Sequence, residues 1–275
     1  MPLILIPTPI GNLEDITLRA LRELRAADVI ACEDTRHTLK LLNHFGIKKK
    51  LLSCHEYNEL KRCETINELL EKGLRVALVS DAGTPGLSDP GAVVARAAAE
   101  SGYEVDALPG ANALLPALLL SGASMEAFMF VGFLPAADEE KRKRLREVMG
   151  LHQTLVFYLA PHHLLKDLAV IASVLGSRRV ALVREISKIH QETITGNLTE
   201  ICDTIPPEKI RGEFVCVISG AEEAPADEGA WQIEALEMAS RGESAKDIAA
   251  AVAEKYGAPK NAVKKFLIEN SDREA

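Results

Sequence analysis

Two short polar segments carry the side chains best suited to moving a proton. They follow the apolar runs at 29–32 and 179–183. A carboxylate can accept a proton from a weakly acidic hydroxyl, and a nearby cation can stabilise the oxygen anion that forms. The candidate catalytic residues are Glu33, Asp34, Arg36, Glu185 and Lys188. For the three acids, helix capping or an ion pair is an equally good explanation.

Three loops rich in Gly and Pro lie at 7–12, 81–86 and 109–112. Each of them directly follows another apolar run. In an open α/β sheet, ligands bind at the carboxyl ends of the strands, where glycine lets the backbone approach closely. None of the loops has the G-x-x-x-x-G-K-[ST] pattern, and no G-x-G-x-x-G follows a strand, which argues against nucleoside triphosphates and NAD. The loops favour a ligand without phosphates that backbone groups can hold, such as S-adenosylmethionine.

Short apolar runs alternate with amphipathic stretches up to residue 220, a pattern typical of mostly parallel sheets covered by helices. We expect strands at 3–6, 29–32, 75–80, 104–108, 128–131, 154–158, 179–183 and 214–218. Helices are expected after Asp15 or Thr17, over 60–72 and from Pro161 to Gly176. A break near 121–124 predicts two α/β domains, 1–121 and 122–220.

The remainder is predicted to be a linker over 221–230 and a small helical module over 231–275. Ser244 resembles a helix start, Gly257-Ala258-Pro259 breaks the chain, and a second helix covers 261–270. This outline is typical of a helix-turn-helix unit. A helical hairpin that packs against the enzyme or its dimer mate explains it equally well.

The net charge of −8 hides local clusters of positive charge. A solvated face explains any one cluster, but three together favour a polyanionic partner such as RNA. The expected RNA-binding residues are Arg36, Lys40, Lys141, Arg142, Lys143, Arg144, Lys264 and Lys265.

Other site classes are disfavoured by composition. The five cysteines include no C-x-x-C pair, and the histidines lack the usual metal-ligand spacing, so we expect neither disulfides nor a metal site. No apolar run is long enough to cross a bilayer, and the first residues do not resemble a signal peptide, so we expect a cytoplasmic protein with no membrane partner.

Several segments together resemble the bacterial small-subunit (16S) ribosomal RNA cytidine-2′-O-methyltransferase family, within the tetrapyrrole methylase superfamily. They lie at 7–17, 31–36, 81–91, 108–110, 132–135, 157–158 with 161–162, and 184–188. The resemblance covers 3–220, and the helical tail is similar to the small C-terminal domain of that family.

The resemblance implies an α/β, two-domain tetrapyrrole-methylase fold (class III methyltransferase) with a small C-terminal helical module, and a homodimer. It implies that S-adenosylmethionine binds in the cleft between the domains. The methyl group would go to the ribose 2′-hydroxyl of a cytidine in the decoding region of 16S ribosomal RNA, as free RNA or in the 30S subunit. The implied cofactor contacts are Pro9, Gly11, Asp81, Ala82, Gly83, Thr84, Gly86, Leu87, Ser88, Asn112, Ala113, Tyr158 and Leu159.

The chain departs from the family pattern at Ala111, Asn112, Leu159, Ala160 and His163. Two alternatives therefore stay open. One is a tetrapyrrole (precorrin or uroporphyrinogen) C-methyltransferase, because a shared fold does not fix the substrate. The other is a catalytically inactive ribosome-associated binding module.

Overall fold

The computed structural model describes residues 2–222 and 228–271. Its contacts divide the chain into two compact units, Met1–Gly220 and Ala221–Ala275, and each is described by itself. In the described ranges, no helix is both long and apolar enough to cross a membrane.

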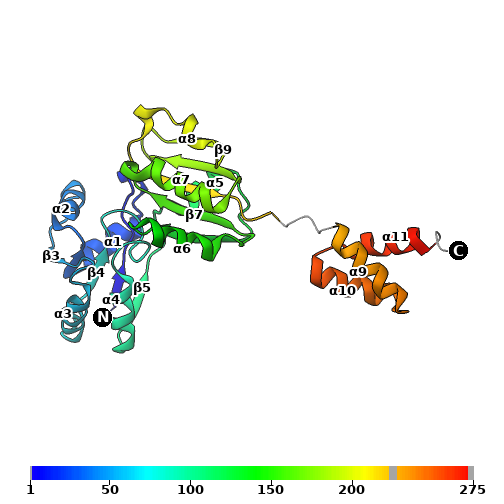
Figure 1. The fold of residues 1–275 in the computed structure, drawn as a ribbon. Coiled ribbons are helices and arrows are strands. Elements are labelled where there is room, and N and C mark those ends of the chain that lie inside the picture. Colours follow the sequence, from blue (N-terminus) through cyan, green and yellow to red (C-terminus); the bar gives the residue numbers. More distant parts are fainter. Residues whose placement is uncertain (1, 223–227, 272–275) are drawn as a thin grey trace. The chain divides into compact units, whose positions relative to one another are not determined.

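The first sheet of unit 1 is entirely parallel, with strand order β3-β2-β4-β1-β5 (Figure 1). Its strands are β1 (Leu3–Leu5), β2 (Val29–Cys32), β3 (Lys50–Ser53), β4 (Val76–Val79) and β5 (Val105–Ala107). Buried side chains of α1 (Leu18–Ala26) and α2 (Thr35–His44) pack on one face. Those of α3 (Glu59–Glu71) and α4 (Ala92–Glu100) pack on the other. The loops after all of these strands therefore emerge at one edge, as an open parallel sheet requires.

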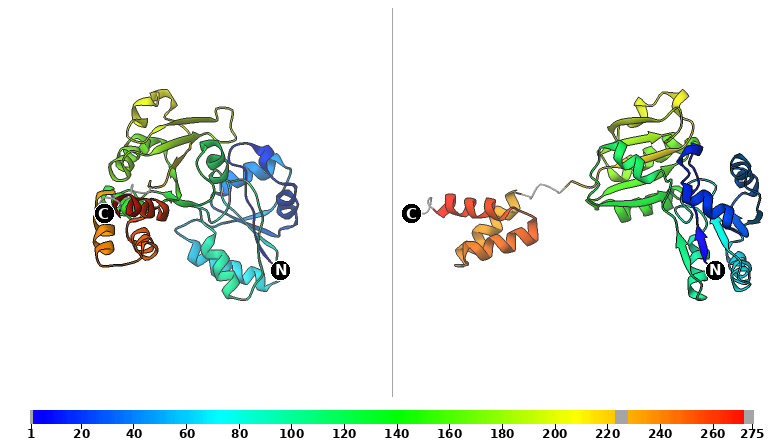
Figure 2. Two further views of the ribbon diagram at one scale, coloured as in Figure 1. Left: turned by 90° about the vertical axis from the view of Figure 1, so that its right-hand side faces the viewer. Right: turned by 180° about the vertical axis from the view of Figure 1, so that it is seen from behind.

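The second sheet of unit 1 has the order β6-β7-β10-β8-β9, and Figure 2 shows it as a body separate from the first. Its strands are β6 (Phe128–Phe133), β7 (Thr154–Leu159), β8 (Arg179–Arg184), β9 (Glu192–Asn197) and β10 (Phe214–Ile218). One face is covered by α6 (Asp138–Val148), α7 (Leu164–Leu175) and α8 (Ile201–Thr204). The other face is covered by α5 (Leu114–Ser121).

The prediction of mostly parallel sheets is wrong for this second sheet. Only the β6–β7 pair is parallel there, whereas the pairs β7–β10, β10–β8 and β8–β9 are antiparallel. Two edge strands, β3 and β9, were also not predicted. Both lack a long apolar run, because an edge strand meets solvent and carries polar residues such as Lys50, Glu192 and Asn197.

The predicted boundary at 121 assigns α5 to the first domain, but α5 packs on the second sheet. Its Leu114 and Leu118 join Val183 and Val215 in one buried cluster. The helix ends at Gly122, whose φ of +66° gives a left-handed cap, which is the feature that suggested a boundary there. The boundary is thus better placed before α5 than after it.

Unit 2 is a three-helix unit of α9 (Glu228–Ser240), α10 (Ala245–Tyr256) and α11 (Lys260–Ser271). Trp231 packs edge-to-face on Phe266, with 5.1 Å between ring centroids, above a small apolar core. The Ser244 hydroxyl accepts a hydrogen bond from the Asp247 N–H and caps α10, as predicted. The predicted linker is three residues too long, because α9 begins at Glu228; its positions 223–227 lie outside the described residues.

Candidate active site

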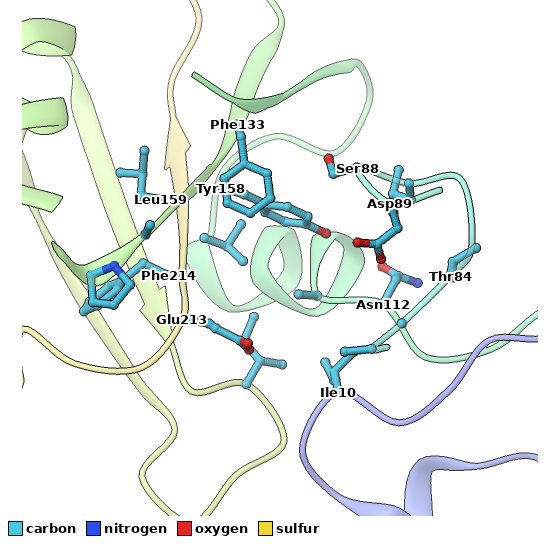
Figure 3. A pocket seen from close by; sticks show the side chains of 18 residues that line it. Ile10, Thr84, Ser88, Asp89, Asn112, Phe133, Tyr158, Leu159, Glu213 and Phe214 are labelled. Carbon is cyan, nitrogen blue, oxygen red and sulfur yellow. The ribbon is translucent and has the colours of Figure 1, made fainter. Parts of the chain in front are cut away.

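A cavity of about 270 Å³ lies where the loops of the first sheet meet the end of the second (Figure 3). Its walls come from the loops after β1, β4, β5 and β8 and from the ends of β6, β7 and β10. The predicted cofactor residues that line it are Ala82, Gly83, Thr84, Leu87, Ser88, Asn112, Ala113, Tyr158 and Leu159. Segments far apart in the sequence thus form one cavity, as the loop positions suggested.

Backbone and side-chain hydrogen bonds join the three loops of the first sheet to one another. Thr8 and Gly83 exchange backbone hydrogen bonds of 2.9 Å in each direction. The Thr8 hydroxyl donates to the Ser80 carbonyl at 3.1 Å, and the Thr84 hydroxyl donates to the Ala111 carbonyl at 3.1 Å. These bonds hold the floor of the cavity before any ligand arrives, which lowers the ordering cost of binding.

Aromatic rings form the wall of the cavity that belongs to the second sheet. Tyr158 packs edge-on against Phe130 and Phe133, with centroid distances of 4.9 and 5.4 Å. Its hydroxyl points toward the side of the cavity formed by Ser88 and Asp89 (Figure 3). Burial and the negative charge of Asp89 raise the pKa of Tyr158 to about 12, so the hydroxyl stays protonated and can donate.

Two carboxylates that were not predicted, Asp89 and Glu213, line this cavity. Burial raises the pKa of Asp89 to about 6, and the charges of Glu33, Asp81 and Glu213 add to the shift. Asp89 lies inside the Gly-rich loop that suggested the site, so its position was a usable signal. Glu213 precedes β10 with no motif around it, and only the fold brings it to the cavity.

A second pocket, of about 410 Å³, adjoins the first and shares Ile10, Ala82 and Glu213 with it. The predicted site residues that line it are Pro9, Gly11, Lys40, Asp81, Ala82 and Lys188. Gly86 lines neither pocket; its N–H donates to the Pro90 carbonyl at 3.2 Å, so its role is to shape the loop.

Two acids bind Lys188 at the second pocket, and a glycine leaves the space that its side chain occupies. Its Nζ lies 3.0 Å from Glu185 Oε1 and 3.2 Å from Glu213 Oε2. Although burial opposes it, this pairing raises the pKa of Lys188 overall. A Cβ on Gly11 would lie 2.5 Å from Lys188 Cγ, so only glycine leaves room for the lysine chain.

Glu185 has a left-handed backbone, with φ of +53°, which is rare for a residue other than glycine. Burial opposes ionisation, but the hydrogen bonds from Lys188 and the Glu213 N–H outweigh it and lower the pKa of Glu185. Such a carboxylate is a weak proton acceptor that positions Lys188 instead.

The segment after β2 has a structural role in this geometry. The Asp34 side chain accepts from the Arg36 N–H at 2.8 Å, caps α2, and pairs with the Arg36 guanidinium at 2.7 Å. The hydrogen bonds from Arg36 hold the pKa of Asp34 well below its usual range. Burial and the charge of Asp81 raise the pKa of Glu33. None of Glu33, Asp34 and Arg36 lines either pocket.

The prediction that Lys141 contacts RNA is wrong. Lys141 is 3% exposed, and its Nζ lies 2.5 Å from Asp167 Oδ1, because it faces the core between α6 and α7. Lys143 is exposed, whereas Arg142 donates to Ser173 at 2.8 Å and Arg144 pairs with Glu147 at 2.9 Å. In unit 2, Lys264 and Lys265 are exposed on α11.

Three of the five departures from the family pattern fall on the cavity wall. Asn112, Leu159 and Ala160 all line the cavity. Asn112 Oδ1 accepts from the Leu115 N–H at 3.0 Å, at the start of α5. The His163 ring lies beside the His162 ring, tilted by 55°, with centroids 4.4 Å apart. Within the described residues, no group of three or more His, Cys, Asp and Glu side chains could hold a metal ion.

Comparisons with known proteins agree with this architecture. The family model described as Tetrapyrrole (Corrin/Porphyrin) Methylases matches residues 2–202. A Bacillus subtilis (strain 168) protein named "Ribosomal RNA small subunit methyltransferase I" is 44% identical over 84% of this chain and 80% of its own. An Escherichia coli O157:H7 protein of the same name is 40% identical over 97% of this chain and 94% of its own.

Solved structures share the fold at lower identity. The methyltransferase CobJ superposes with a TM-score of 0.61 at 20% identity, covering 82% of this chain and 97% of its own. Uroporphyrin-III C-methyl transferase from Thermus thermophilus, complexed with S-adenyl homocysteine, gives 0.57 at 17% identity, covering 80% and 97%. The chain therefore belongs to the tetrapyrrole (corrin/porphyrin) methylase family, alongside the relatives named ribosomal RNA small subunit methyltransferase I.

Proposed function

We propose that this enzyme transfers a methyl group from S-adenosylmethionine to the ribose 2′-hydroxyl of a cytidine in the decoding region of 16S ribosomal RNA. The observation that carries the proposal is the cavity at the meeting of the two sheets, which most of the expected cofactor residues line. Relatives 40–44% identical and named for small-subunit ribosomal RNA support an RNA substrate rather than a tetrapyrrole.

The residues of the cavity fit S-adenosylmethionine. Tyr158, Leu159 and Phe214 offer an apolar wall for a flat aromatic group, and the loops of the first sheet offer backbone groups. Among the described residues that line the cavity there is no Lys or Arg, whereas Asp89 and Glu213 are acidic. This balance favours a ligand with a positive sulfonium over a phosphate-bearing one. When bound, S-adenosylmethionine supplies the electrophilic methyl group.

The protein must align the ribose hydroxyl, exclude water and accept the hydroxyl proton. Asp34 and Glu185 are paired with cations, and Glu33 lines neither pocket, so the predicted acceptors are poorly placed. Glu213 also pairs with Lys188, but unlike Glu185 it lines both pockets and its side chain is 75% exposed, so we assign it as the acceptor. Lys188, 3.2 Å from Glu213, is positioned to stabilise the oxygen as it loses its proton.

The proposal includes a homodimer that works in the cytoplasm on the 30S subunit or its RNA. The exposed face of α5 supports the dimer, because Leu115, Leu119 and Leu120 are 44%, 68% and 43% exposed on an apolar helix. A row of exposed leucines is typical of a surface that another chain covers.

The function is tested with radiolabelled S-adenosylmethionine and 30S subunits that lack the modification, followed by nucleoside mapping. We expect label on the 2′-oxygen of one cytidine. Label on a base, or on uroporphyrinogen but not on RNA, would show a different methyltransferase. Failure to bind S-adenosylmethionine in calorimetry would identify an inactive binding module.

A further inference from the structure

One face of α2 forms a wall of the second pocket. His37, Lys40 and His44 are spaced three and four residues apart, so they share this face, and all three line the pocket. Their side chains are exposed, and α2 itself contains no acidic residue. Lys40 has no ion pair within the described part of the chain. This helix therefore presents to the pocket one lysine outside any ion pair of the described residues, together with two imidazoles that can donate hydrogen bonds.

The acids of the second pocket are partly satisfied by other groups. Asp81 Oδ1 accepts from the Asp34 N–H at 3.0 Å, and Glu213 pairs with Lys188. Lys40 and Lys188 both line the second pocket, and neither lines the first. Of the residues that the structure describes, two acids and no Lys or Arg line the first cavity, whereas the second pocket has two lysines beside its two acids, so only the second offers cations to an anionic ligand.

The two pockets meet at Ile10, Ala82 and Glu213. A methyl group that leaves a ligand in the first pocket for an acceptor in the second must pass this junction. An in-line transfer needs the acceptor oxygen on the far side of the methyl group, which the adjoining arrangement provides.

We propose that the second pocket binds the acceptor nucleotide of the RNA, and that His37, Lys40 and His44 of α2 hold a phosphodiester beside the target ribose. This assignment rests on the proposed function and deepens it. The phosphate fixes the position of the nucleotide, and the ribose hydroxyl then lies toward Glu213 and Lys188. Phosphate contacts of this kind orient a nucleic acid without reading its sequence.

The test is the triple variant His37→Gln/Lys40→Gln/His44→Gln. All three side chains are exposed, so the fold should tolerate it, and Lys40→Gln alone gives a milder form. We expect the KM for 30S subunits to rise about tenfold or more with kcat changed less, since a hydrogen bond to a charged group is worth about tenfold or more in affinity. The slope of log affinity against log salt, measured with a decoding-region RNA, should fall by about one. The affinity for S-adenosylmethionine should stay within about twofold.

The matched control is Lys61→Gln, which removes one exposed positive charge from α3, on the opposite face of the first sheet. This variant should leave both the KM for 30S subunits and the affinity for S-adenosylmethionine unchanged. An unchanged KM and salt slope in the triple variant would overturn the proposal, as would an equal loss of S-adenosylmethionine binding. If the unaltered enzyme does not methylate RNA, the proposed function fails instead, whatever the variants do.

Discussion

Replacing Asp89 by Asn should stabilise the ligand-free protein at neutral pH. Burial, with the charges of Glu33 and Asp81, raises the pKa of Asp89 to about 6 from the ordinary 3.8. A difference of about two pKa units corresponds to about 3 kcal/mol, and solvent screening of this half-buried group reduces it to about 1 kcal/mol. Ionised Asp89 therefore costs the native state about 1 kcal/mol, which Asn avoids.

The pH dependence follows from the direction of the shift. The native state keeps the Asp89 proton up to about pH 6, whereas the unfolded chain loses it near pH 4. The stabilising contribution of the protonated group is complete below the unfolded pKa and is lost as pH rises through about 6. The advantage of Asp89→Asn should thus be full at about pH 7.5 and vanish near pH 4.

The assay is urea unfolding followed by far-ultraviolet circular dichroism, without ligand, across this pH range. The only tryptophan, Trp231, is buried in unit 2, so its fluorescence follows that unit and should not respond to the variant. Asp203→Asn, which removes an exposed carboxylate from α8, is the matched control. Equal effects of Asp89→Asn at both ends of the pH range, or none at neutral pH, would refute the reasoning.

Two further predictions concern unit 1. Lys141→Met leaves Asp167 buried without its cation and should lower the free energy of unfolding by about 3 kcal/mol. The control Lys143→Met, at an exposed position, should change it by less than about 0.5 kcal/mol. Equal effects of the two variants in urea unfolding would contradict the burial of Lys141. Gly11 has a φ of +147°, and Gly11→Ala places a methyl group against the Lys188 side chain. The variant should lower the free energy of unfolding by about 1–3 kcal/mol and slow methyl transfer. An unchanged unfolding midpoint and an unchanged methyl-transfer rate would show that the lysine side chain moves aside freely.

The sequence predicted the elements whose residues are buried on both sides. Strands such as β4 and β10 read as continuous apolar runs, because helices cover both faces. The edge strands β3 and β9 gave no such signal. The antiparallel order of the second sheet was also out of reach, since local patterns do not encode which strands pair.

The site was predictable where loops follow predicted strands. The loop at 81–91 was found because its glycines and its position both point to a ligand. Glu213 was found only in the structure, because the fold alone brings it beside the cavity. Lys40 was predicted to contact RNA, and the structure adds that it lines a pocket next to that cavity. Lys141 shows the converse: a basic run predicts solvent exposure, but a helix turns one residue in three or four toward the core.

In sequence order, the residues that line the cavity begin with Ile10, near the start of unit 1, and end with Val215, near its end. A chain made from its N-terminus therefore lacks a complete cavity until β10 has been synthesised and paired. Because a ligand stabilises only the form that binds it, the cofactor can protect the finished unit but not its shorter precursors. Fragments that stop before β10 should be degraded at the same rate with or without S-adenosylmethionine, whereas the finished chain should be spared by it.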